Sequence, residues 1–150
     1  MPFQIRRVQP SDQPSILKLI ETIQPDAVWS AEHYQWQYLS EPGGNAALYA
    51  TEVDGQIVAF YAAVITRLRV NGKILPAWRI QDVMTHPEHR GQGYLHKLGE
   101  RCLADMRACG ALGYTFPNHL SEKSFRRTGW TELCRVPVRS MSIAAAADSE

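Results

Sequence analysis

Several features that define common protein classes are missing from this sequence. It has three cysteines, an odd number, and their spacing fits no metal-binding pattern. We expect them to be reduced and to act as small buried hydrophobic residues, with Cys102 and Cys109 on the apolar face of an expected helix. No apolar run approaches the length of a membrane span, and the N-terminus has no apolar signal core. The sequence therefore predicts a cytoplasmic protein with no membrane segment and no bound metal.

An excess of charge of one sign is missing as well. The chain has 16 lysines and arginines against 15 aspartates and glutamates, a formal net charge of +1, and no long basic run. Nucleic-acid binding needs a concentrated basic face, so this balance disfavours a nucleic-acid partner. A small acidic ligand needs only local positive charge. The 150 residues, 45% of them hydrophobic and 21% charged, predict one globular domain over residues 1–150.

What is present is a clear alternation of strand and helix signals. The hairpin signals Asp54-Gly55 and Asn71-Gly72 separate three β-rich runs and predict that these runs pair antiparallel. Strands are expected at residues 3–8, 47–53, 56–70, 73–85 and 112–116, with one or two more within 130–143 and a frayed tail over 144–150. Helices are expected between a cap at 10–12 and Pro25, over 31–39, from 95 to about 110, and over 120–128. The pattern predicts an α/β (α+β) fold.

The most informative segment is a glycine-rich turn, Arg90-Gly91-Gln92-Gly93-Tyr94-Leu95, between an expected strand and an expected helix. Such a turn leaves several backbone N–H groups unpaired, and the helix N-terminus adds about half a positive charge there. Gly91 and Gly93 have no Cβ, which allows a phosphate to approach the main chain, and Arg90 adds a permanently charged, forked donor. The turn therefore predicts a ligand that carries a phosphate or pyrophosphate.

Two other phosphate-binding folds do not fit this turn. The dinucleotide fingerprint needs a third glycine, an early parallel sheet, and an acidic residue at the end of the next strand, where this chain has Phe116. The P-loop needs Gly-Lys-Ser/Thr after its first glycine, and that sequence is also missing. The sequence excludes both folds.

The turn resembles instead the diagnostic segment of the GNAT superfamily of acyl-CoA-dependent N-acyltransferases. That segment, Gln/Arg-x-x-Gly-x-Gly/Ala, follows the fourth strand and opens the third helix of the family fold. Arg90, Gly91, Gln92 and Gly93 match it, whereas Leu95 stands where a small residue is common. This departure leaves less room at the start of the helix but keeps the backbone donors.

A second resemblance to the same family lies further along the chain. The family has Asn-x-x-Ala-x-x-x-Tyr-x-x-x-Gly-Phe around its fourth helix, and this chain matches the spacing with Asn118, Ser121, Phe125, Gly129 and Trp130. The two motifs occur in the family's order, with the expected number of elements between them. Together they cover nearly the whole domain.

The resemblance implies a fold, a reaction and a cofactor site. The fold would have a mixed, mainly antiparallel sheet flanked by helices, with splayed strands 4 and 5. The reaction would transfer an acetyl group from acetyl-CoA directly to a primary amine of a small-molecule or peptide acceptor. A homodimer paired through the last strands would fit the family. The implied cofactor-binding residues are Val83, Met84 and Thr85, through their main chain, and Arg90, Gly91, Gln92, Gly93, Tyr94, Leu95, Asn118 and Phe125.

The general base of the expected site has several candidates. A lysine-type amine, with a pKa near 10.4, is protonated at neutral pH and has to lose a proton before it can react. Asp82, near the end of the central strand, is the leading candidate, although it could instead pair with Arg79 or cap a loop. Three histidines, or a water chain that ends on one of them, are weaker candidates: His86, His89 and His119.

The general acid of many relatives is a tyrosine on the fourth helix, and this chain has Phe125 in its place. A thiol with a pKa near 8.5 leaves tolerably well as a thiolate, so the acid is helpful rather than required. Ser121 or Ser124 could hold a water molecule nearby. The missing hydroxyl leaves one alternative open, an acyl-CoA-binding sensor or regulatory module with little catalysis.

For two further groups of side chains the sequence allows both a functional and a structural interpretation. Lys123, Arg126 and Arg127 either reach cofactor phosphates or form a solvated helix face. Five aromatic or imidazole side chains form two helical stripes that either line the acceptor site or pack in the core: Trp29, His33 and Trp36 in one, Tyr34 and Tyr38 in the other. The identity of the acceptor does not follow from these residues.

Overall fold

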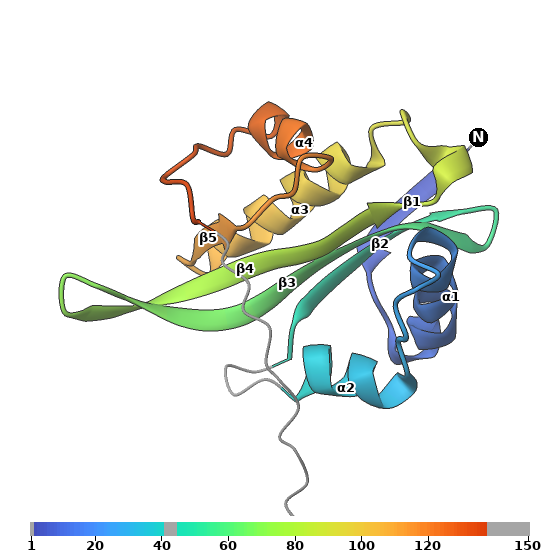
Figure 1. The fold of residues 1–150 in the computed structure, drawn as a ribbon, viewed down its shortest axis with the longest axis horizontal. Coiled ribbons are helices and arrows are strands. Elements are labelled where there is room, and N and C mark those ends of the chain that lie inside the picture. Colours follow the sequence, from blue (N-terminus) through green and yellow to red (C-terminus); the bar gives the residue numbers. More distant parts are fainter. Residues whose placement is uncertain (1, 41–44, 138–150) are drawn as a thin grey trace, which may run out of the picture.

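The computed structural model describes residues 2–40 and 45–137. Its elements, in order, are β1 (Phe3–Arg7), η1 (Pro10–Asp12), α1 (Gln13–Ile23), α2 (Ala31–Leu39), β2 (Ala47–Val53), β3 (Gln56–Val70), β4 (Lys73–Thr85), η2 (Pro87–His89), α3 (Tyr94–Ala108), β5 (Leu112–Thr115) and α4 (Glu122–Arg127). The strands form one sheet in the order β1-β2-β3-β4-β5 (Figure 1). Among the described strands only β4 and β5 pair parallel, so the sheet is mixed and mainly antiparallel, as predicted.

The two hairpins predicted from Asp-Gly and Asn-Gly are present. Asp54 and Asn71 have φ values of 47° and 49°, and the glycines that follow them have φ values of 78° and 77°. Positive φ at both central residues is the requirement of a type I′ turn, whose twist matches that of the flanking strands. Because these signals are local, the predicted bounds of β2, β3 and β4 agree with the structure.

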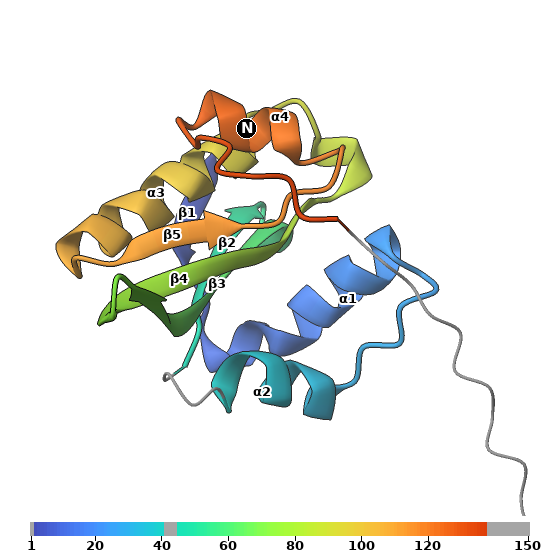
Figure 2. The ribbon, with the colours of Figure 1, turned by 60° about the vertical axis from the view of Figure 1, so that its left-hand side comes forward.

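The helices form a layer on each face of the sheet (Figures 1 and 2). On one face α3 packs over β2, β3, β4 and β5, and on the other α1 packs over β3 and contacts α2. We call the two apolar clusters between these layers the α3-side core and the α1-side core. The α3-side core includes Tyr49, Tyr61, Trp78, Leu98, Cys102 and Phe125. The α1-side core includes Ile16, Ile20, Tyr34, Tyr38, Phe60 and Met84.

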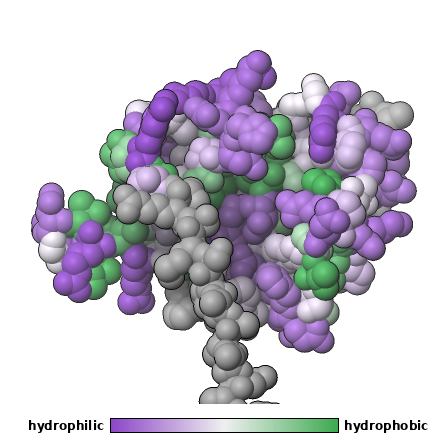
Figure 3. Space-filling view, in the orientation of Figure 1, coloured by the Kyte–Doolittle hydropathy of each residue, from purple (hydrophilic) through white to green (hydrophobic). Residues whose placement is uncertain are grey.

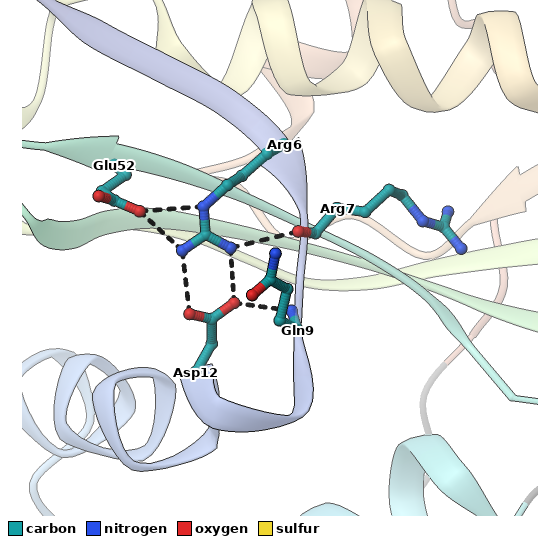
Figure 4. Close-up of polar contacts among 5 residues, drawn as sticks. All are labelled: Arg6, Arg7, Gln9, Asp12 and Glu52. Atoms are coloured by element: carbon teal, nitrogen blue, oxygen red, sulfur yellow. Dashed lines mark hydrogen bonds and ion pairs between the residues drawn. The ribbon is translucent and has the colours of Figure 1, made fainter.

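A charged cluster around Arg6 anchors the start of α1 to the sheet (Figure 4). The Arg6 guanidinium on β1 donates to Asp12 Oδ2 and Oδ1 at 2.6 and 2.9 Å, and to Glu52 Oε2 on β2 at 2.7 and 2.9 Å. The hydrogen bond from Arg6 holds the pKa of Asp12 below its usual range. The cluster therefore joins two strands to the turn that begins the α1–α2 layer.

The face of the molecule drawn in Figure 3 is mostly hydrophilic, with scattered hydrophobic residues. The β3–β4 hairpin projects beyond the rest of the sheet (Figure 1), and its exposed side chains include Val70 and Ile74 next to Arg67, Arg69 and Lys73. In residues 2–40 and 45–137, no helix combines the length and the apolar character needed to cross a membrane.

Three expectations from the sequence need correction. Residues 130–137 were expected to begin a strand but form none. Leu133 is 95% exposed, and Pro137 has no N–H for a ladder. The rest of that expected segment and the expected tail lie outside the described residues. Only Cys102 is buried, and its burial raises the pKa of its thiol to about 12. Cys109, at the end of α3, and Cys134, in the coil after α4, are exposed.

Candidate functional site

The glycine-rich turn before α3 forms an open cradle of backbone amides. Gly91 and Gly93 have φ values of 78° and 76°, and Gly93 is the N-cap of α3 without a side-chain cap. A Cβ added to either glycine would meet no atom within 4 Å, so the space in front of the turn is open. Within the described part of the chain, the N–H groups of residues 91–96 donate no hydrogen bond. The cradle can therefore bind an anion.

The same turn is tied to the end of β4. Arg90 Nε donates to the Thr85 carbonyl oxygen at 3.3 Å, which leaves the two Nη groups of an exposed guanidinium beside the cradle. His86 caps the short η2 helix by accepting a 3.4 Å hydrogen bond from the Glu88 N–H. His86 thus has a local structural role, and Arg90 stands where the sequence predicted a charged donor.

Beyond Ile80, β4 has no pairing with β5. The parallel register runs from Ala77 opposite Leu112 to Ile80 opposite Thr115, and Thr115 Oγ1 closes it with a 3.0 Å hydrogen bond to the Ile80 carbonyl oxygen. β4 continues to Thr85 with only its β3 edge paired (Figure 2). The splay predicted for strands 4 and 5 is therefore present. Residues 83–85, predicted to contact the cofactor through their main chain, lie in this unpaired part.

A β-bulge near the splay turns Asp82 toward α2. Gln81 is opposite Ala62 and Met84 is opposite Phe60, so Asp82 and Val83 together face Tyr61. Asp82 takes the bulge position with φ of 50°, a left-handed conformation that Asp tolerates better than most residues. Because of this extra residue, Val83 packs against the α3-side core while the Asp82 carboxylate points to the other face.

The partner of Asp82 is Tyr38, at the end of α2. Tyr38 Oη donates to Asp82 Oδ2 at 2.8 Å, and no ion pair joins Asp82 to Arg79 among the described residues. The Tyr38 ring is fully buried. Burial, followed by the negative charge of Asp82, raises the pKa of Tyr38, so its hydroxyl stays protonated and remains a donor. One carboxylate oxygen of Asp82 is therefore held, and Oδ1 has no partner in the described residues.

Two more polar side chains, Arg79 and Gln81, lie on the same face of β4. The sequence suggested only Arg79, as a partner for Asp82. Arg79 is opposite Val64 and Gln81 is opposite Ala62, and Val64 and Ala62 both belong to the α1-side core. Arg79 Nε and Gln81 Nε2 are buried and have no hydrogen-bond partner in the part of the chain that the structure describes. The signal that could have found them is the alternation of polar residues within a central, otherwise apolar strand.

The aromatic stripes divide between core and surface. Tyr34 and Tyr38 belong to the α1-side core, with their ring centroids 5.0 Å apart. Trp29 stacks on Tyr38 at 6.0 Å and lies 4.4 Å from His33, whereas Trp36 is 65% exposed. The rings of the second stripe therefore support Asp82 from within the core, and Trp36 faces solvent.

Three residues predicted to contact the cofactor also have structural roles. Asn118 Oδ1 accepts from the Leu120 and Ser121 N–H groups at 3.0 and 2.9 Å, so it caps the turn that leads into α4. Phe125 is 6% exposed and packs against Trp130 at a centroid distance of 5.4 Å, and the Tyr94 side chain is also buried. Contacts of these residues with a cofactor remain predictions.

The basic side chains of α4 surround a shallow surface hollow of about 450 Å³, together with His119. Arg126 is already paired with Glu122 at 2.8 Å and Glu132 at 2.6 Å, which fits the interpretation of a solvated helix face. Lys123 and Arg127 are exposed beside it.

The amide cradle at the start of α3, the unpaired edge of β4 and the carboxylate on the bulge thus lie along one continuous part of the chain. The chain belongs to the acetyltransferase (GNAT) domain family, whose model matches residues 4–133. The resemblance read from the two motifs is thereby confirmed.

Solved structures with a similar fold come from distant relatives. They include a glucosamine-6-phosphate N-acetyltransferase from Arabidopsis thaliana, with a TM-score of 0.74 and 17% identity over 95% of this chain and 100% of that chain. An aminoglycoside antibiotic 6'-N-acetyltransferase from Acinetobacter baumannii has a TM-score of 0.73 and 18% identity over 95% and 100%. An acetyltransferase from Trypanosoma brucei has a TM-score of 0.69 and 18% identity over 95% and 99%. No curated protein sequence matches the chain.

Proposed function

We propose that this protein is an acetyl-CoA-dependent N-acetyltransferase that acts directly on a primary amine. The observation that carries the proposal is the course of β4, whose unpaired edge connects the amide cradle after Thr85 to the carboxylate of Asp82. A diphosphate ligand with a long thioester-bearing arm matches that course. Family membership supports the same reaction, and two structural relatives are named for acetyl transfer to amino groups of sugars or aminoglycosides.

The residues present fit acetyl-CoA. The open amides of residues 91–96 and the Arg90 guanidinium would hold the diphosphate, and the main chain of residues 83–85 would pair with the amide groups of the pantetheine arm. When bound, acetyl-CoA supplies an acetyl group activated as a thioester. A main-chain N–H on the free β4 edge, already fixed in place by the strand, would polarise the thioester carbonyl.

Asp82 would act as the general base. Tyr38 holds Oδ2, so Oδ1 can accept the proton of the incoming amine. The deprotonated amine would then take the acetyl group, and the coenzyme would be released as its thiolate. Solvent would supply the proton for that sulfur, because Phe125 has no hydroxyl to donate.

The test is the acetyl-dependent release of free thiol in the presence of a panel of amines, including amino sugars and aminoglycosides. We expect release to require both acetyl-CoA and an amine, and to yield an acetylated amine of the expected mass. Acetyl-CoA hydrolysis that is independent of any amine would contradict direct transfer to an acceptor.

A second candidate function is an acyl-CoA-binding sensor. The observation that favours it is Phe125, buried in the α3-side core where many relatives have a catalytic tyrosine. Tight acetyl-CoA binding without turnover across the amine panel would support the sensor, and thiol release would exclude it.

A further inference from the structure

We propose that the amine acceptor carries an anionic oxygen group, a carboxylate or a phosphate, which binds to Arg79 and Gln81 on β4. The inference rests on the proposed function, because it assigns the substrate class of the same site. It starts from two side chains that find no hydrogen-bond partner among residues 2–40 and 45–137. Arg79 Nε and Gln81 Nε2 are buried donors, and buried donors in folded proteins are nearly always satisfied.

The two donors lie beside the candidate base. Arg79 and Gln81 share the α1-side face of β4, and the bulge brings Asp82 to that face as well. Residues rise about 3.3 Å each along a strand, so Arg79 and Asp82 are separated by roughly 10 Å of main chain. A short acceptor can therefore reach both, with its amine at Asp82 and its far end at Arg79.

The charges in this region select an anion for that far end. Arg79 forms no ion pair with the described residues, and the nearest carboxylate on its strand, Asp82, is held by Tyr38. A half-buried guanidinium without a counter-ion is costly, and two oxygens of a carboxylate or a phosphate match its forked donors. The Gln81 amide adds a neutral donor beside it. A polycationic acceptor would instead meet the positive charge of Arg79.

The experiment uses probes that share one amine and one chain length. They are 5-aminopentanoate, 5-aminopentyl phosphate, pentylamine and 1,5-diaminopentane, which end in a carboxylate, a phosphate, a methyl group and an ammonium. We expect one or both anionic probes to bind and to react with a KM at least about tenfold below that of pentylamine, and the diamine to be the poorest. Comparison of the two anionic probes shows whether the group is a carboxylate or a phosphate.

The variants are Arg79→Gln and Gln81→Leu, with Arg67→Gln as the matched control. Arg67 is an exposed arginine on the same hairpin, so its replacement removes the same charge away from the site. Arg79→Gln should raise the KM of the preferred anionic probe about tenfold or more and leave the KM of acetyl-CoA and the kinetics of pentylamine unchanged. Arg79→Lys should restore part of the loss.

Calorimetric binding of the probes separates this inference from the proposed function. If an anionic probe binds to the wild type, loses affinity in Arg79→Gln and yet is not acetylated, the proposed function fails and the oxyanion site stands. If neither binding nor turnover prefers an anionic probe to pentylamine, the oxyanion site is wrong, whatever the enzyme acetylates. Equal losses for all four probes in Arg79→Gln would also overturn it, since they would show a structural role.

Discussion

The groups that we propose for the cofactor and for the acceptor are built in different ways on the two sides of β4. The groups proposed for the cofactor, after Thr85, are backbone amides, exposed by two glycines with positive φ and by the start of a helix. The groups proposed for the acceptor, on the α1-side face, are the side chains of Asp82, Arg79 and Gln81, which a bulge and a neighbouring helix bring together. Backbone groups suit a cofactor shared by a whole family, and side chains suit an acceptor that differs between its members.

The largest effect is expected when the amide cradle is closed by a side chain. Gly93→Val places a β-branched residue at φ of 76° and puts a side chain into the open space in front of the turn. Loss of two hydrogen bonds to a charged phosphate, each worth about 1.5–3 kcal/mol, predicts roughly a 100-fold or greater loss of coenzyme A affinity. Isothermal titration calorimetry measures the change.

Gly72→Val is the matched control for that variant. Gly72 has φ of 77° in the β3–β4 hairpin and also has open space around it, so it carries the same backbone strain far from the cradle. Equal losses of affinity in the two variants would mean that strain, and not the cradle, is responsible.

The next largest effect should come from the acceptor side. Asp82→Asn keeps the shape, the left-handed backbone and an oxygen for Tyr38, but it removes the base. We expect kcat to fall about 100-fold, the typical contribution of a general base, with coenzyme A affinity unchanged. Steady-state kinetics together with calorimetry can show this. A variant with full kcat would exclude Asp82 as the base.

Removing the Tyr38 hydroxyl should have a moderate effect. Tyr38→Phe leaves the ring in the α1-side core but frees Asp82 Oδ2, so the carboxylate loses its orientation. A hydrogen bond to a charged group is worth about 1.5–3 kcal/mol, and we expect kcat to fall roughly tenfold with a comparable part appearing as lost stability.

Tyr34→Phe is the control for this substitution. Tyr34 belongs to the same core and is 3% exposed, but it makes no side-chain hydrogen bond among the described residues. If it lowers kcat as much as Tyr38→Phe does, the effect belongs to the packing of α2 and not to the contact with Asp82.

The smallest effect on activity should come from the anchor of the α1–α2 layer. Asp12→Asn removes the ion pair with Arg6, and we expect a loss of about 1.5–3 kcal/mol of unfolding free energy at pH 7. The pKa of Asp12 is lowered from its ordinary value of 3.8, so the wild type holds this stability above pH 3.8 and loses it as pH falls through the folded-state pKa.

Denaturant unfolding at pH 7 and near pH 3 measures that difference. The difference in unfolding free energy between the wild type and Asp12→Asn should become smaller in acid. Asp26→Asn, at an exposed position, should have the same unfolding free energy as the wild type at both pH values. In Asp12→Asn, a few-fold rise in the acceptor KM with an unchanged coenzyme A affinity would show that the α1–α2 layer affects the acceptor side of β4 and not the cofactor side. A gap that widens in acid would contradict the role of the ion pair.

The parts that could be predicted from the sequence are those with local causes. Asp54-Gly55 and Asn71-Gly72 specify their own hairpins, and the glycines of the turn specify the cradle, so strands and turn lie where they were expected. The bulge depends on the register between β3 and β4. The contact between Tyr38 and Asp82 joins residues 44 apart in the chain, and no local pattern encodes it.

Two wrong expectations have the same kind of cause. Cys109 matches the apolar spacing of α3, yet it stands after the last helical residue, where nothing covers it. The residues after Gly129 have the composition of a strand, but residues 130–137 pair with no strand of the described sheet. In both cases the pattern along the chain was present and the tertiary partner was not.

The most direct test of a cofactor that follows β4 is a backbone amide NMR titration with acetyl-CoA. The largest chemical-shift changes should fall on residues 91–96 and 83–85, with much smaller changes in the projecting hairpin of residues 66–76. Changes centred on that hairpin, or none at all at millimolar acetyl-CoA, would contradict the assignment of the cradle and the free strand edge to the cofactor.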